Sequence, residues 1–197
     1  PSNGTLSSIT NNQVVYTPTQ DWNGEDTFTY KANDGTVDSN TATATITVAS
    51  VEDTPTTEDV SASTDEDTAV DITLDGSDVD GDDLTYSIVS DVSNGSTSLS
   101  GSTVTYTPSA NFNGTDTFTY NVNDGDENSN TSTVTITVAA VNDAPTTDDD
   151  TASTDEDTAV DISITASDIE ADDVTFSIVS DVSNGTTSLT DSTVTYT

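Results

Sequence analysis

The sequence repeats itself with an offset of 90 residues, and this repeat constrains the fold more than any other feature. The segment VEDTP at 51–55 returns as VNDAP at 141–145, and Ser87–Gly95 returns unchanged as Ser177–Gly185. The repeat divides the chain into the C-terminal part of one unit (1–50), a whole unit (51–140) and the N-terminal part of a third (141–197). A disordered chain has no need of such duplication, so the repeat predicts a tandem array of folded units.

The whole unit shows the period-2 alternation of β-strands and no helical period. Val134, Ile136 and Val138 alternate with threonines, as do Phe118 and Tyr120. Such runs lie near 60–63, 69–74, 84–89, 96–99, 103–107, 117–122 and 133–138, separated by turn residues, most of them containing glycine. About seven short strands in one unit predict an all-β fold, an antiparallel, seven-stranded Greek-key β-sandwich.

The composition excludes several classes of function. The formal net charge is −36 and Lys31 is the only basic residue, so nucleic acid and anionic lipid surfaces are not expected partners. Without Cys or His, the chain has no zinc site, thiol nucleophile or histidine base. No apolar run is long enough to insert into a membrane. Paired carboxylates could serve glycoside hydrolysis, but no aromatic-lined cleft accompanies them, and we do not expect an enzyme.

The acidic residues gather in loops that an up-and-down arrangement of strands brings to the two ends of each sandwich. Loops after the second and sixth strands face the linker before the unit, and loops after the first and fifth face the linker after it. The first set is Asp78, Asp80, Asp82, Asp83, Asp124, Asp126 and Glu127, facing Glu52 and Asp53. The second set is Asp65, Glu66, Asp67 and Asp116, facing Asn142 and Asp143 with Asp168 and Glu170 of the next unit.

Acids that converge at a junction repel one another unless a cation neutralises them. Calcium takes 6–8 oxygen ligands, whereas magnesium prefers small octahedral sites that keep several waters. The pattern therefore predicts Ca²⁺ at both inter-repeat junctions, with solvated loop acids as the alternative. We interpret Asp82, Asp83, Asp126 and Asp148 to Asp150 as surface charge.

Several motifs resemble those of cadherin-type repeats. They are Asp78-Val79-Asp80, Asn123-Asp124-Gly125 and the linker Val141–Pro145. With Tyr106-Thr107-Pro108, Phe112–Asp116 and Asp65–Asp67, the chain is most similar to the cadherin-like (Ig-like) tandem repeats of very large bacterial surface adhesins. The resemblance implies repeats arranged as a rod with calcium between successive domains. The animal cadherin Leu-Asp-Arg-Glu stretch is absent, and the Phe112–Asp116 loop stands in its place.

Carried over by motif, the resemblance implies two sets of metal ligands. The first junction would use Asp26, Glu52, Asp53, Asp78, Asp80 and Asp124, and the second would use Glu66, Asp116, Asn142, Asp143, Asp168 and Glu170. Glu52 and Asn142 occupy the same repeat position, a difference that bears on affinity. Trp22, which stands where the next unit has Phe112, is interpreted as a packing residue.

These observations predict a structural spacer or filament segment of an extracellular adhesin-type protein, on a bacterial cell surface or secreted. Because Pro1 is not an initiator residue, we read the chain as an excerpt of a longer protein. Its partners would be the neighbouring repeats of the same chain, and like chains in a filament. The alternative is an adhesion module that binds carbohydrate or a second copy of itself. The sequence does not identify a receptor.

Overall fold

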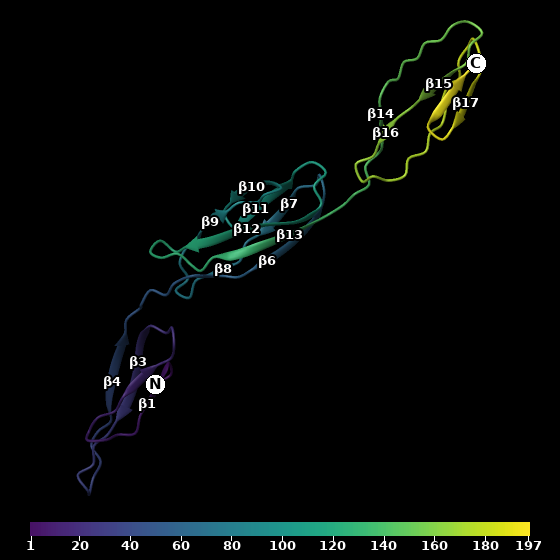
Figure 1. The fold of residues 1–197 in the computed structure, drawn as a ribbon. Helices are drawn as coiled ribbons and strands as arrows, with labels where there is room; N and C mark the ends of the chain where they lie inside the picture. The colour runs from purple at the N-terminus through teal and green to yellow at the C-terminus, as the bar shows by residue number, and fades with distance from the viewer.

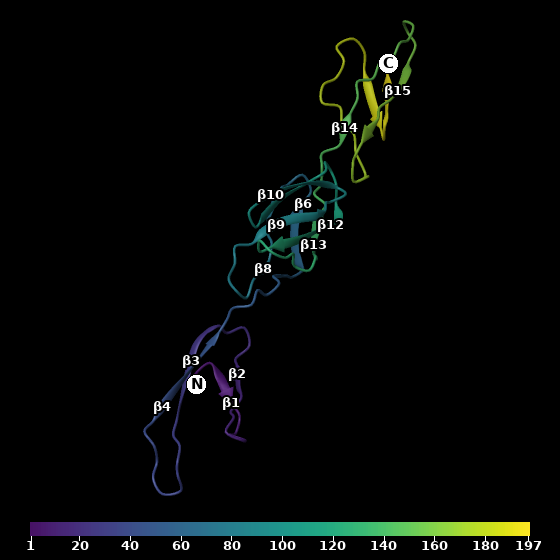
Figure 2. The same ribbon diagram turned by 90° about the vertical axis from the view of Figure 1, so that its left-hand side faces the viewer.

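The computed structural model describes residues 1–197, which form three β-units one after another along a line (Figure 1). The N-terminus lies in the unit at one end and the C-terminus in the unit at the other, and the view turned by 90° shows the same order (Figure 2). The secondary structure consists of strands alone. No helix of the length and apolarity that a membrane span requires is present. The expectation of an all-β tandem rod is confirmed.

The middle unit is a sandwich of two sheets. The four-stranded sheet has the order β6 (Val60–Asp65), β13 (Ser132–Ala139), β12 (Gly114–Asn123) and β9 (Thr85–Ser90). The three-stranded sheet has the order β10 (Gly95–Ser100), β11 (Thr103–Pro108) and β7 (Val70–Thr73). All seven predicted strands of this unit are therefore present. The structure adds one short pair that the alternation did not predict, β5 (Thr56–Thr57) with β8 (Gly76–Ser77).

One strand pair of the middle unit is parallel. β6 runs parallel to β13, with Val60 opposite Val134, whereas the other pairs are antiparallel. Seven strands that alternate in direction leave the first and the last pointing the same way, so their pairing has to be parallel. The Greek-key sandwich is confirmed, although it is not antiparallel throughout.

The core of the middle unit is built from the apolar positions of the alternation. Phe118, Tyr120, Val134 and Ile136 of the four-stranded sheet are fully buried, and they pack against residues of the facing sheet such as Val104. The alternating threonines are more exposed. Burying one large apolar side chain stabilises a fold by about 1.5–3 kcal/mol, so each of these residues contributes to holding the two sheets together.

The two outer units carry parts of the same pattern. The first contains β1 (Gly4–Leu6), β2 (Tyr16–Pro18), β3 (Gly24–Tyr30) and β4 (Ala42–Val48). The third contains β14 (Thr146–Thr147), β15 (Val160–Ser163), β16 (Ala166–Ser167), β17 (Thr187–Thr190) and β18 (Thr193–Tyr196). The buried apolar side chains of the core all belong to the middle unit.

Candidate functional site

The loop after β8 is shaped by one aspartate. Asp78 Oδ1 accepts hydrogen bonds from the backbone N–H groups of Asp80 at 2.8 Å, Gly81 at 2.9 Å and Asp82 at 3.3 Å. Short polar side chains favour such turns because they replace backbone partners. The other oxygen, Oδ2, is enclosed and has no hydrogen-bond partner. The turn therefore holds a free carboxylate oxygen at the end of the sandwich.

The first linker, Val51–Pro55, contacts this loop and the loop after β12. The N–H of Asp53 donates to Asp80 Oδ2 at 2.8 Å, and the hydroxyl of Thr54 donates to Glu127 Oε2 at 2.7 Å. Asp124 shapes the second loop, since its Oδ1 accepts from the N–H groups of Asp126 and Glu127. These bonds from Glu127 and Asp126 lower the pKa of Asp124. The loops that the strand order assigned to one end do meet there, with Asp124 positioning Glu127.

The carboxyl groups of Glu52 and Asp53, in the first linker, lie among other acidic side chains. The charges of Asp82 and Asp80, followed by partial desolvation and the charge of Asp126, raise the pKa of Glu52. Asp82 and Asp126 are exposed, as expected of surface charge, and their charges act on Glu52 of the linker. No basic side chain offsets this charge at the junction, so the folded chain holds like charges together.

Desolvation, followed by the charges of Asp21, Asp80 and Asp78, raises the pKa of Asp53. Asp21 belongs to the preceding unit, and the motif comparison did not select it. It lines a cavity of about 340 Å³ at the junction together with Trp22, Asp53 and Asp80. Its left-handed backbone, with φ 57°, belongs to a turn in which the Trp22 N–H donates to the Thr19 carbonyl. Alignment of the repeats could have identified this position, because it holds Asp21 in the first unit and Asn111 in the next, both with a side-chain oxygen.

The second junction repeats the arrangement of the first. The N–H of Asp143 donates to Glu170 Oε2 at 3.0 Å, as that of Asp53 does to Asp80. Asp168 Oδ1 accepts from the N–H groups of Glu170 and Asp172, so it shapes its loop as Asp78 does. A cavity of about 390 Å³ is lined by Asn111, Asp143 and Asp168. The amide of Asn142 donates to the Asp143 carbonyl at 2.9 Å within the linker.

Glu66 is the most deeply buried acid at this junction, with 3% of its surface exposed. Its Oε1 accepts a hydrogen bond from the N–H of Val141, the first residue of the second linker. Its Oε2 is enclosed without any partner, and so is Oδ2 of Asp143. Buried polar atoms are nearly always hydrogen-bonded, and a buried charge is normally paired or bound to a metal. These two oxygens therefore lack a positively charged partner.

Asp116 has a different role from the one that the motif comparison assigned. Its two oxygens accept hydrogen bonds from the backbone N–H groups of Ser93, Asn94 and Thr117 and from the hydroxyl of Tyr106. Burial acts to raise the pKa of Asp116, but these bonds outweigh it and hold the pKa below its ordinary value. Both oxygens are occupied, so Asp116 ties the loop after β9 to β12 and offers no free ligand to a cation.

Asp26, one repeat earlier, has the equivalent role. Its oxygens accept from the N–H groups of Ser2, Asn3 and Thr27 and from the hydroxyl of Tyr16. Burial acts to raise the pKa of Asp26, but the hydrogen bonds prevail and lower it to about 2. We therefore leave Asp26 and Asp116 out of the candidate site.

The donors at both junctions are oxygen atoms only, which suits a hard cation such as Ca²⁺. No three acidic side chains converge closely enough to form a complete metal cage in this arrangement. The fit rests instead on the three enclosed carboxylate oxygens without partners, which belong to Glu66, Asp78 and Asp143. All three are at the junctions, and each would be satisfied by a cation.

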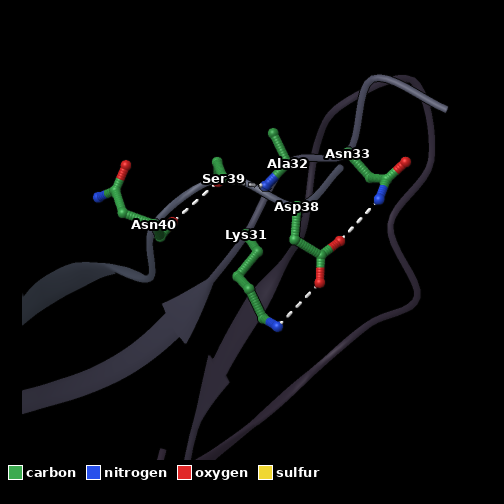
Figure 3. A network of polar contacts seen from close by, with 6 residues as sticks. All are labelled: Lys31, Ala32, Asn33, Asp38, Ser39 and Asn40. Carbon is green, nitrogen blue, oxygen red and sulfur yellow. Dashed lines mark hydrogen bonds and ion pairs between the residues drawn. The ribbon is translucent and has the colours of Figure 1, made fainter. Parts of the chain in front are cut away.

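The only basic side chain of the chain lies away from both junctions. Figure 3 shows Lys31 in the loop between β3 and β4, paired with Asp38 at 3.0 Å, while Asn33 donates to the same carboxylate. This loop is at the end of the first unit opposite the linker. Both partners of the ion pair are about half exposed, at 53%. Lys31 therefore does not neutralise the acids of the junctions.

Comparison with known proteins agrees with this architecture. A family model described as bacterial Ig domain matches residues 1–47, 52–137 and 142–197. A search of curated proteins gave no match. Among solved structures, the protocadherin gammaB7 EC3-6 cis-dimer matches with a TM-score of 0.52 and 16% identity, over 99% of this chain and 57% of that one.

Two further solved structures are less similar. Human mucin-like protocadherin EC1-2 has a TM-score of 0.48 and 19% identity, over 70% of this chain and 84% of its own. An endo-fucoidan hydrolase of glycoside hydrolase family 107 has a TM-score of 0.38 and 21% identity, over 100% of this chain. The chain spans only 32% of that hydrolase, and the likeness carries no argument about activity.

The predicted likeness to cadherin-type tandem repeats is confirmed by the strand order and by the protocadherin match. The family matches cover nearly the whole length, one for each of the three units. The chain belongs to the bacterial Ig domain family.

Proposed function

We propose that this chain is a structural spacer segment of an extracellular adhesin-type protein, located on a bacterial cell surface or secreted. Tandem sandwiches in a line suit the projection of a distant binding domain or the body of a fibre. The proposal includes calcium as the stiffening cation of the junctions. The direct partners are the neighbouring repeats, and like chains where a filament forms.

The observation that carries the calcium proposal is the buried, unpartnered oxygen of Glu66. An ionised carboxylate buried without a partner destabilises a fold by several kcal/mol, and the usual remedies are protonation or a cation. Glu66 lies against Val141, at the start of the linker that carries Asp143. A cation held between these residues would contact both the middle unit and the linker.

The proposed ligands come from both sides of each linker. At the first junction they are Asp21, Glu52, Asp53, Asp78, Asp80 and Asp124, and at the second they are Glu66, Asn142, Asp143, Asp168 and Glu170. Bound calcium would supply the positive charge that these oxygens lack. Asp78 and Asp168 hold their loops in place through backbone N–H groups, so that the second oxygen of each stays available.

The proposed mechanism is mechanical. Without a cation, like charges from adjacent units repel and the linker samples many angles. With calcium bound, residues of the linker and of both units share one set of ligands, which restricts those angles. Extracellular modules bind calcium with dissociation constants of about 10⁻⁴–10⁻³ M, so the stiff form would prevail outside cells.

Calorimetric titration of the metal-free chain with calcium tests the proposal. We expect binding in the range of about 0.1–1 mM. Glu66→Gln keeps the size of the side chain but removes its charge, and should weaken one class of sites. Asp149→Asn, at an exposed position away from both cavities, removes the same charge and should leave the titration unchanged. The absence of binding at millimolar calcium would contradict the proposal.

A further inference from the structure

The two junctions use the same repeat positions with different charges. Three positions are acidic at both: Asp53 and Asp143, Asp78 and Asp168, and Asp80 and Glu170. Two positions are acidic only at the first junction, where Asp21 and Glu52 stand in place of Asn111 and Asn142. Over these shared positions, the second junction therefore has two negative charges fewer than the first.

Asp21 and Glu52 both act on the first junction. Asp21 lines the first cavity with Asp53 and Asp80, and its charge is among the causes that raise the pKa of Asp53. Glu52 directly precedes Asp53 in the linker, and the Asp53 N–H bonds Asp80 Oδ2 at 2.8 Å. Both side chains are exposed and neither forms a hydrogen bond that the fold depends on. Their contribution to the junction is charge.

Asn111 and Asn142 keep the geometry of the first junction without its charge. Asn111 has the same left-handed backbone as Asp21, with φ 57° at both, and it lines the second cavity with Asp143 and Asp168. Asn142 uses its amide N–H to bond the Asp143 carbonyl in the linker. An amide can still offer a neutral oxygen to a cation, but it adds no attraction of charge.

Both junctions contain enclosed carboxylate oxygens that lack a hydrogen-bond partner, and this holds whatever the number of acids. Glu66 is more than nine-tenths buried at the second junction. Its Oε1 bonds the Val141 N–H, whereas its Oε2 has no partner, and Oδ2 of Asp143 has no partner either. At the first junction the enclosed Oδ2 of Asp78 is equally without a partner. The junctions therefore differ in the strength of a site and not in its presence.

We propose that the residues at positions 21/111 and 52/142 give the two junctions different calcium affinities, so that the first holds calcium more tightly than the second. Calcium affinity rises with the number of charged ligands. At the shared positions the first junction has two more carboxylates than the second, and Glu66 offsets one of them at the second. As calcium falls, the second linker softens first, and bending is concentrated between the middle and third units. This inference rests on the proposed function.

The chain offers a reporter for each junction. Trp22 is the only tryptophan, and it lines the first cavity, so its fluorescence reports the first junction alone. Phe112 occupies the same repeat position and follows Asn111, which lines the second cavity. The double variant Trp22→Phe with Phe112→Trp therefore moves the reporter from one junction to the other. Calorimetry on the same samples measures total binding without any reporter.

The test exchanges charge within each junction of the full chain, so that every junction is compared with itself. Asp21→Asn with Glu52→Asn should raise the calcium midpoint of the Trp22 signal by about tenfold. Asn111→Asp with Asn142→Glu, made with the Phe112→Trp reporter, should lower the midpoint of the second junction by a similar factor. In both cases the untouched junction should keep its midpoint.

The outcomes separate this inference from the function on which it rests. If calorimetry shows calcium binding but neither exchange moves its own midpoint by more than about twofold, the proposed difference in affinity is wrong and the calcium clamp stands. If the unaltered chain binds no calcium by calorimetry, both proposals fail. Midpoints that follow the exchanged charges, in both directions, support the difference in affinity.

Discussion

The same nine residues fold differently in the middle and third units. In the middle unit, Ser87–Gly95 contains most of β9, which pairs with β12 through registers such as Ile88 opposite Tyr120. In the third unit, the identical segment Ser177–Gly185 forms no strand. Residues 141–197 contain no counterpart of β12, so the segment has no partner. The difference shows that these Thr-rich strands depend on pairing and core packing more than on intrinsic propensity.

The first and middle units show the same dependence in their side chains. The motif Asp-Thr-Phe-Thr-Tyr occurs in both, yet Phe118 and Tyr120 are fully buried, whereas Phe28 is partly exposed and Tyr30 is 52% exposed. The hairpin β3–β4 lacks the flanking strands that β12 and β13 have. Among residues 1–197, the closed core therefore belongs to the middle unit.

The largest expected effect comes from equivalent phenylalanines. Phe118→Ala should lower the free energy of unfolding of the middle unit by about 3–5 kcal/mol, because it leaves a cavity in a closed core. Phe28→Ala should change the main unfolding transition by less than about 1 kcal/mol, because its site is open. Urea unfolding of both variants measures the difference. Equal losses would contradict the assignment of the closed core to the middle unit.

The next effect concerns the buried aspartates. Asp116→Ala leaves the N–H groups of Ser93, Asn94 and Thr117 without their acceptor, and should destabilise the middle unit by about 3 kcal/mol. The matched variant Asp26→Ala should leave the main transition nearly unchanged. If Asp116→Ala weakened calcium binding at constant stability, its role would be that of a ligand after all.

The pH dependence of the stability of the middle unit follows from Asp116. Hydrogen bonds hold the pKa of Asp116 below its ordinary value of 3.8, so the stabilisation is present above that value. It is lost as pH falls through the lower pKa of the folded state. Unfolding of the middle unit, followed between pH 5 and about pH 2, should show this loss. Asp116→Asn should reduce the slope, and an unchanged slope would argue against the assignment.

The smallest expected effect is at Glu66. In metal-free solution Glu66→Gln should raise the stability of the middle unit by about 1 kcal/mol, because it removes a buried charge whose second oxygen has no partner. The added stability that calcium gives the unaltered chain should shrink in this variant. Thermal unfolding with calcium and with a chelator measures both. A loss of stability in metal-free solution would show that Glu66 is already satisfied.

Much of the fold was predictable because each strand carries its own period-2 pattern and the repeat identifies the units. The pair β5–β8 was missed because two residues are too few to show a period. The prediction that Asp78, Asp80 and Glu127 share one end also follows from strand order alone. The ligand roles that the resemblance implied for Asp26 and Asp116 do not fit the structure, because a motif does not show that backbone N–H groups occupy both oxygens. It passed over Asp21, whose position is asparagine in the next unit.

Small-angle scattering of the full chain in calcium and then in excess chelator tests the central claim most directly. The account predicts that the maximum dimension increases with calcium and decreases on chelation. Asp78→Ala with Asp80→Ala should weaken the change, while Asp149→Ala should preserve it. A particle that is equally extended in both conditions would contradict the account, because calcium would then not be what holds the repeats in line.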